Sequence, residues 1–154
     1  MAHKPHHTHG TWKEQLNDAE QQVRESGGRW TDMRSNVLES ILKSRKPLTA
    51  YKIIEILSAK LERDVKPASV YRSLDALSEM GIIVRIESIN AYASCQHPHE
   101  DHHHIFLVCR DCGIADELVD EAAAQSLTKA ATHLGFSIEK QVMELQGYCK
   151  GCHP

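Results

Sequence analysis

The sequence predicts an α+β fold, in which an N-terminal helical domain ends in a β-hairpin and a small α/β domain with an antiparallel sheet follows. Three observations lead to this prediction. Residues 11–81 contain four segments of helical periodicity with recognisable start or stop signals. The next segment, "IIVRIESINAYA", is rich in β-branched residues with a polar interruption, which indicates two paired strands. From Cys95 onward, cysteines and histidines alternate with short apolar segments.

The N-terminal helices are recognisable by the residues at their ends. The segment "TWKEQLNDAEQQVRESGG" predicts a first helix that its two final glycines terminate. Thr31 or Asp32 can cap a second helix, and Thr49 opens a third. Pro67 suits the first position of a fourth helix, which Gly81 stops. Three helices followed by a hairpin give the order of a winged helix-turn-helix, so residues 11–94 are expected to form a winged-helix DNA-binding domain.

The C-terminal part, residues 95–154, predicts a different architecture. The segments "HIFLVC" and "GIADELV" resemble strands on either side of a Cys-x-x-Cys turn, residues 120–134 form a helix, and "FSIEKQVMELQGY" is a last strand. An antiparallel sheet with one helix is small, so we expect it to pair with a second copy as a dimerisation domain. Residues 1–10 are polar and rich in histidine and are expected to be a disordered tail.

Charge is segregated along the chain, although the net charge is only −3. Residues 34–85 contain ten Lys or Arg against six Asp or Glu, whereas the rest contains eight against fifteen. A basic N-terminal half can bind a polyanion such as DNA. Ordinary surface variation is the alternative explanation.

Composition also favours a cytoplasmic protein. No stretch approaches the roughly 20 apolar residues that span a bilayer, and the N-terminus lacks the apolar core of a secretory signal. Cytosolic thiols are kept reduced, so the five cysteines are expected to be metal ligands rather than disulfides.

Four of the cysteines form two Cys-x-x-Cys pairs that 36 residues separate. Each pair can chelate from a tight turn, and two turns supply the four thiolates of a tetrahedral zinc site. Gly113 and Gly151 would let the backbone bend close to the sulfurs. Two unrelated core or redox pairs are the alternative. The spacing favours one structural zinc, with these ligands: Cys109, Cys112, Cys149 and Cys152.

The histidines that precede this site need a separate explanation. Cys95 and the histidines are either a second, mixed-ligand metal site or part of a solvated loop, and Glu117, on the strand after the Cys-x-x-Cys turn, could add an oxygen ligand to that site. In a strand, His102 and His104 would point to one side and His103 to the other. Mixed sulfur, nitrogen and oxygen ligands would bind zinc more reversibly than four thiolates. The histidines concerned are His97, His99, His102, His103 and His104.

Together these motifs resemble the ferric uptake regulator (Fur) superfamily. The segment "KPASVYRSLDALSEMGII", the hairpin, the histidine-rich segment, CxxCG and the terminal CxxC occur in the order of that family. Within it, "IESINAYASC" and "HIFLVCRDCG" are most similar to the zinc uptake regulator (Zur) branch. The resemblance implies a homodimeric, metal-dependent repressor of zinc uptake and homeostasis genes that binds double-stranded operator DNA in the cytoplasm and does not interact with membranes.

The resemblance also assigns ligands to the second site. It implies regulatory zinc bound by Cys95, His102 and Glu117. The wing histidine that often supplies a fourth ligand is replaced by Val84, so His97, His99 or His104 would have to take its place. A sulfur ligand suits zinc better than iron.

The expected DNA contacts lie on the third and fourth helices. Tyr71 and Arg72 point away from the apolar face of the fourth helix, near its N-terminus, where recognition helices meet base edges. The resemblance adds Tyr51 as a backbone contact. Arg34 and Lys66 are expected contacts from charge and position only.

Three other functions remain possible from the sequence alone. A Fur-family regulator could respond to iron or manganese instead of zinc. A zinc-dependent enzyme would need an open zinc position beside a general base, and the sequence shows no such signature, so no enzyme is expected. A zinc buffer would have no use for a winged helix.

Overall fold

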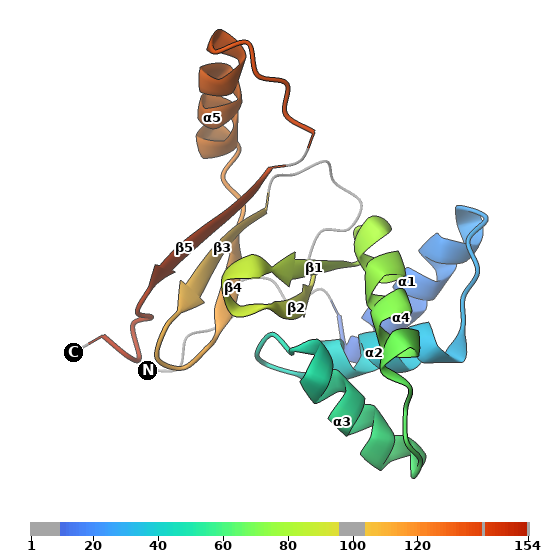
Figure 1. Ribbon diagram of the computed structural model, residues 1–154. Coiled ribbons are helices and arrows are strands. Elements are labelled where there is room, and N and C mark those ends of the chain that lie inside the picture. Colours follow the sequence, from blue (N-terminus) through green and yellow to red (C-terminus); the bar gives the residue numbers. More distant parts are fainter. Residues whose placement is uncertain (1–9, 96–103, 140, 154) are drawn as a thin grey trace. The chain divides into compact units, whose positions relative to one another are not determined.

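The computed structural model describes residues 10–95, 104–139 and 141–153 (Figure 1). The described residues up to Cys95 belong to one compact unit, and those from His104 onward belong to another. The predicted boundary between residues 94 and 95 remains a proposal, because the residues that follow it lie outside the described segments. The predicted tail, residues 1–10, lies outside them except for its last residue.

The N-terminal unit contains the four predicted helices and the hairpin. In chain order its elements are α1 (Trp12–Glu25), α2 (Asp32–Lys43), α3 (Ala50–Leu61), α4 (Pro67–Glu79), β1 (Ile83–Ile86), the 3₁₀ turn η1 (Glu87–Ile89) and β2 (Ala91–Ser94). The hydroxyls of Thr11, Thr31 and Thr49 each accept the N–H of the residue three positions on, at 3.3, 3.2 and 3.2 Å. Each threonine thereby satisfies one of the free N–H groups at a helix start, so Thr31 is the cap of α2.

The core of this unit lies where α2, α3 and α4 meet. The inward face that the sequence predicts for α4 is confirmed, since Val70, Leu74 and Leu77 are fully buried. β1 and β2 pair antiparallel, and Leu48 adds a short bridge to Tyr92 through N–H···O bonds of 2.9 and 2.8 Å. The helices followed by a paired hairpin confirm the winged helix-turn-helix.

The C-terminal unit is a three-stranded sheet with one helix. Its elements are β3 (His104–Cys109), β4 (Ala115–Leu118), α5 (Glu121–His133) and β5 (Val142–Gly147). The strand order is β4-β3-β5, and β3 pairs antiparallel with β4, as predicted. β5, however, runs parallel to β3, so the sheet is mixed. In Figure 1, α5 lies beyond the end of the sheet at which β4 finishes and β3 starts. The chain leaves α5 at this same end, so β5 runs in the direction of β3.

Large exposed apolar side chains are concentrated in this C-terminal unit. Among the described residues, the N-terminal unit exposes only Tyr51 and Tyr71 in this class. The C-terminal unit exposes Leu107, Leu118, Val119, Leu127, Leu134, Phe136, Leu145 and Tyr148. Exposed apolar side chains that gather in one patch are typical of surfaces that a partner covers. None of the helices in the described segments has the length and apolar character needed to cross a bilayer.

Candidate functional site

Two chain reversals bring the four cysteines of the Cys-x-x-Cys pairs together. After β3 the chain turns at Gly113, whose φ of 72° is in the left-handed region, and the Gly113 N–H donates to the carbonyl of Cys109 at 3.0 Å. After β5 a second turn forms as the Cys152 N–H donates to the carbonyl of Cys149 at 2.9 Å. Gly151 has no positive φ, and an added Cβ would meet only the Cys149 sulfur, at an ordinary 3.9 Å. Glycine is therefore required at the first turn and not at the second.

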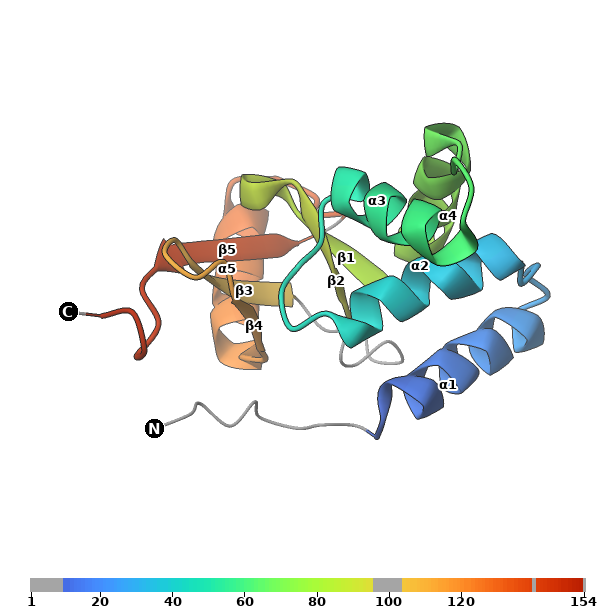
Figure 2. The ribbon, with the colours of Figure 1, turned by 90° about the horizontal axis from the view of Figure 1, so that it is seen from below.

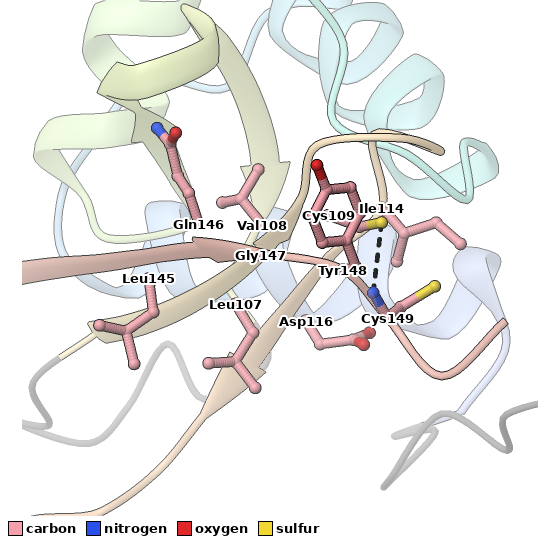
Figure 3. Close-up of a pocket in the computed structure, with 10 residues that line it drawn as sticks. All are labelled: Leu107, Val108, Cys109, Ile114, Asp116, Leu145, Gln146, Gly147, Tyr148 and Cys149. Carbon is pink, nitrogen blue, oxygen red and sulfur yellow. Dashed lines mark hydrogen bonds between the residues drawn. The ribbon is translucent and has the colours of Figure 1, made fainter. Parts of the chain in front are cut away.

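The two turns are held against each other by the sheet. The Arg110 N–H donates to the carbonyl of Gly147 at 2.9 Å, which extends the β3–β5 pairing into the turns. The Cys149 N–H also donates to the sulfur of Cys109 at 3.4 Å, the contact drawn as a dashed line in Figure 3. All four ligand sulfurs lie within 4.8 Å of one another. Strand pairing therefore brings together two pairs of cysteines whose first members, Cys109 and Cys149, are 40 residues apart in the sequence.

The sulfur separations match a tetrahedral metal site rather than disulfides. The Cys112 and Cys149 sulfurs are 3.8 Å apart, and none of the five cysteines forms a disulfide. In a regular tetrahedron with Zn–S bonds of about 2.3 Å, two sulfurs lie about 3.8 Å apart, whereas a disulfide bond is about 2.05 Å long. The donor set and its spacing therefore fit a closed zinc site.

The electrostatics of the cluster also favour a cation. Backbone N–H groups of Cys112 and Cys149 lower the pKa of Cys109 to about 6. The neighbouring sulfurs of Cys149 and Cys112 raise the pKa of Cys152 to about 12. Thiolates this close repel one another, so they do not all ionise at neutral pH by themselves. A divalent cation removes that repulsion and releases the remaining protons.

A cleft of about 250 Å³ lies beside the cluster, on the sheet of the same unit. Figure 3 shows Leu107 and Leu145 on one side of the strands, with Val108 and Gln146 on the other. Leu107 and Leu145 are neighbours in the β3–β5 register and are both exposed. Apolar side chains beside the cluster therefore belong to the exposed surface of this unit.

Two of the predicted regulatory ligands are described, one in each unit. Cys95 follows β2, its backbone N–H donates to the carbonyl of Ile82 at 3.0 Å, and its side chain is buried. Glu117 lies in β4, opposite Phe106 in the register with β3, and is half-buried. Val84 is buried in β1, consistent with an apolar role for that position.

The histidines of the predicted regulatory site are not described. His97, His99, His102 and His103 lie outside the described residues, and the side chain of His104, the first residue of β3, is not described either. The second metal site therefore stays a prediction.

The predicted DNA contacts on α3 and α4 are accessible. Tyr51, in the first turn of α3, is 77% exposed, and Tyr71 on α4 is 48% exposed. Arg72 is exposed, and its Nε donates to the carbonyl of Ala68 at 3.3 Å. These two tyrosines are the large apolar side chains that the described N-terminal unit leaves in solvent. Their exposure is what a contact surface requires.

The two contacts expected from charge alone differ in their surroundings. Lys66 is the N-cap residue of α4 and is exposed, beside the helix end that carries Tyr71. Arg34 is half-buried in the first turn of α2, and its Nη1 donates to the carbonyl of Arg29. Arg34 is therefore partly occupied by the loop that precedes α2, and its role in DNA binding stays a prediction.

One exposed basic residue of the hairpin was missed by the sequence analysis. Arg85 lies in β1 between the buried Val84 and Ile86 and is exposed. The signal is the single charged residue among three apolar ones in "IVRI", because a charged side chain is seldom buried.

Comparisons with known proteins agree with this architecture. The profile of the ferric uptake regulator family matches residues 25–146. The chain is 30% identical over 143 residues to the zinc uptake regulation protein of Escherichia coli (strain K12), covering 92% of this chain and 83% of that protein. It superposes with a TM-score of 0.87 on a zinc uptake regulator complexed with zinc and DNA, at 29% identity, covering 92% of this chain and 95% of that one. A crystal structure of holo XcZur gives a TM-score of 0.79 at 35% identity, with 88% and 94% coverage.

The profile spans most of the chain and covers the larger part of both described units, from the end of α1 to the end of β5. The similarity extends over nearly the whole length of the relatives as well. The chain therefore belongs to the ferric uptake regulator family.

Proposed function

We propose that the protein is a zinc-responsive transcriptional repressor, which binds operator DNA as a dimer when a regulatory zinc site is filled and so controls zinc uptake and homeostasis genes. The observation that carries the proposal is the cluster of four sulfurs within 4.8 Å, in a chain whose other unit is a winged helix. Relatives named as zinc uptake regulators, one of them solved with zinc and DNA, support the same function.

The structural zinc site in this proposal is the four-sulfur cluster. When bound, zinc would supply a fixed cross-link between the turn after β3 and the turn after β5, in addition to the hydrogen bonds from the Arg110 N–H to Gly147 and from the Cys149 N–H to Cys109. Four thiolates leave no open position for a substrate, which is typical of structural rather than catalytic zinc. This agrees with a transcription regulator and not with an enzyme.

DNA recognition in this proposal belongs to α3 and α4. Arg72 can contact guanine bidentately or clamp a phosphate, and Tyr71 can contact a thymine methyl group or the backbone. Tyr51 and Lys66 would contact the backbone near the start of each helix. Arg34 is the fifth proposed contact, on the basis of its charge and position alone.

The dimer interface in this proposal is the exposed apolar surface of the C-terminal unit. Leu134 and Phe136, after α5, are 87% and 67% exposed, and Leu145 on β5 is 57% exposed. Apolar side chains at this exposure are stabilised by a partner surface. A second copy of the chain is the partner that also supplies two winged helices for two operator half-sites.

Regulation in this proposal depends on the mixed-ligand set of Cys95, His102 and Glu117, with His97, His99 or His104 as the fourth ligand. Such a set is open to exchange with the free zinc pool. Zinc bound there favours the DNA-binding form of the dimer, and by linkage DNA strengthens zinc binding equally. A repressor of this kind works on the chromosome, so we place it in the cytoplasm.

The experiment that tests this function is operator binding titrated against buffered free metal. The operator duplex is first selected from a random-sequence library with the zinc-loaded protein. Zinc should support binding at far lower free concentrations than iron or manganese. Preferential activation by iron or manganese would move the protein to a different metal within the family, and metal-independent binding would contradict the proposal.

A further inference from the structure

Arg85 occupies a defined position on the hairpin between β1 and β2. Its Nη2 donates to Oδ1 of Asn90 at 2.9 Å, and its Nε forms an ion pair with Glu87 at 3.3 Å. Asn90 has a φ of 47° in the left-handed region, so the turn itself presents this oxygen to the guanidinium. The side chain of Arg85 nevertheless remains 46% exposed. The arginine is therefore oriented by its own turn and still accessible to a ligand.

The hairpin turn lies on the side of the N-terminal unit that also carries the proposed reading helices. Figure 2 shows the turn between β1 and β2 on the same side of this unit as α3 and α4, whereas α1 lies along the opposite side. Lys52, Lys66 and Arg72 are the exposed basic residues of α3 and α4 near the two exposed tyrosines. Through its contacts with Asn90 and Glu87, the guanidinium of Arg85 lies at this turn.

Tyr92 links Arg85 to α4. Arg85 and Tyr92 are directly opposite each other in the β1–β2 register, so their side chains share one face of the hairpin. Burial raises the pKa of Tyr92, the charge of Arg85 opposes the shift, and Asp75 and Tyr71 of α4 add to it. Tyr92 therefore shares one face of the hairpin with Arg85, and charges on α4, the helix that carries Tyr71, influence its hydroxyl.

We propose that Arg85 is a DNA-contacting residue of the wing, which binds a backbone phosphate of the operator beside the groove that α4 reads. This inference rests on the proposed DNA-binding function and adds a second element to it. A guanidinium carries five N–H donors, and the two contacts within the described part of the hairpin use Nη2 and Nε. The remaining donors suit phosphate oxygens, which arginine binds as a fork.

Because Asn90 and Glu87 hold the side chain in place, less rotamer entropy is lost when it binds. A phosphate contact carries no sequence information, so Arg85 should contribute affinity and register while Tyr71 and Arg72 contribute specificity.

The test compares the salt dependence of DNA binding in Arg85→Ala and in wild type, in excess zinc. The selected operator duplex and an unrelated duplex of equal length are used. The variant should lose two phosphate contacts per dimer, one in each copy. Each lost contact lowers the slope of log affinity against log salt by about 0.9, so the ratio of the affinity at 50 mM salt to that at 200 mM salt should shrink by about 12-fold on both duplexes. Arg85→Lys keeps the charge and should keep the wild-type ratio.

Arg24→Ala is the matched control. Arg24 is also an exposed arginine in an ion pair, with Glu20 at 2.7 Å, but it lies on α1, and its removal changes the net charge equally. This variant should keep the wild-type ratio. The inference would be overturned if Arg85→Ala kept the wild-type ratio, even with weaker binding. It would also be overturned if Arg24→Ala changed the ratio equally. Either outcome would leave the proposed function standing. Failure of the zinc-loaded wild type to bind any duplex would overturn both.

Discussion

Replacing the two cysteines that follow β5 tests whether the four-sulfur cluster holds the C-terminal unit together. The double substitution Cys149→Ser, Cys152→Ser leaves only two of the four cluster sulfurs, those of Cys109 at the end of β3 and Cys112 in the turn after it. In the wild type, a metal bridging Cys112 and Cys149 closes a loop of 37 residues. Closing a loop of this length removes about 4 kcal/mol of chain entropy from the unfolded state at 25 °C, if the metal acts like a covalent cross-link.

This loss is large compared with the total stability of a domain, which is roughly 5–15 kcal/mol. It corresponds to a fall of roughly 15–30 °C in the melting temperature of a small domain. The C-terminal unit should therefore unfold or lose its dimer at temperatures where the wild type is intact. The helices α1 to α4 should persist, because the core of their unit contains none of the four cysteines.

The assay is thermal unfolding followed by circular dichroism, combined with the zinc content of the purified protein. Cys95→Ser is the matched control, because it removes a cysteine that lies outside the cluster. The double variant should show an early transition that this control lacks, and about one zinc fewer per chain than the wild type. A double variant with the melting temperature of the control and the zinc content of the wild type would refute the cross-link argument.

Three further predictions concern recognition, stability and assembly. Arg72→Ala should weaken operator binding by about 1–3 kcal/mol and relax its sequence preference, measured by fluorescence anisotropy at matched salt; unchanged affinity would exclude α4 as the reading helix. Glu39→Gln should lower stability by about 1 kcal/mol at pH 7, because ion pairs with Lys43 and Lys60 lower the pKa of Glu39 from its ordinary 4.5. This difference is fully present above pH 4.5 and should disappear as the pH falls through the lowered pKa. Urea titrations at pH 7 and at a pH below that lowered pKa should therefore give different values of it; equal differences at both would contradict the ion pairs. Leu145→Asp should yield a folded monomer, because the side chain is already 57% exposed in one chain; an unchanged dimer mass by light scattering would exclude this surface.

The sequence predicted the elements whose signals are local. The caps at Thr31 and Thr49 and the proline that opens α4 lie at the expected helix starts, because capping depends on residues three positions apart. The four-cysteine cluster was equally predictable, since two tight turns with free thiols have few other uses.

Features that depend on long-range geometry were not predictable. The parallel pairing of β5 with β3 follows from the position of α5, which no local pattern encodes. The bonds of Lys60 to Asn36 and Glu39 join α3 to α2 across more than 20 residues. The guanidinium of Arg34 donates to the Arg29 carbonyl because of a loop conformation that charge counting does not reveal.

The central claim is that a regulatory zinc site, distinct from the four-sulfur cluster, switches DNA binding on. The most direct test is the free zinc concentration at half-maximal operator binding, compared between wild type and Cys95→Ser. A serine hydroxyl is a poor zinc ligand at neutral pH, so the variant should fold, dimerise and keep about one zinc per chain in the cluster. It should nevertheless need far more free zinc to bind its operator. Cys95→Ser with an unchanged zinc midpoint would contradict the account.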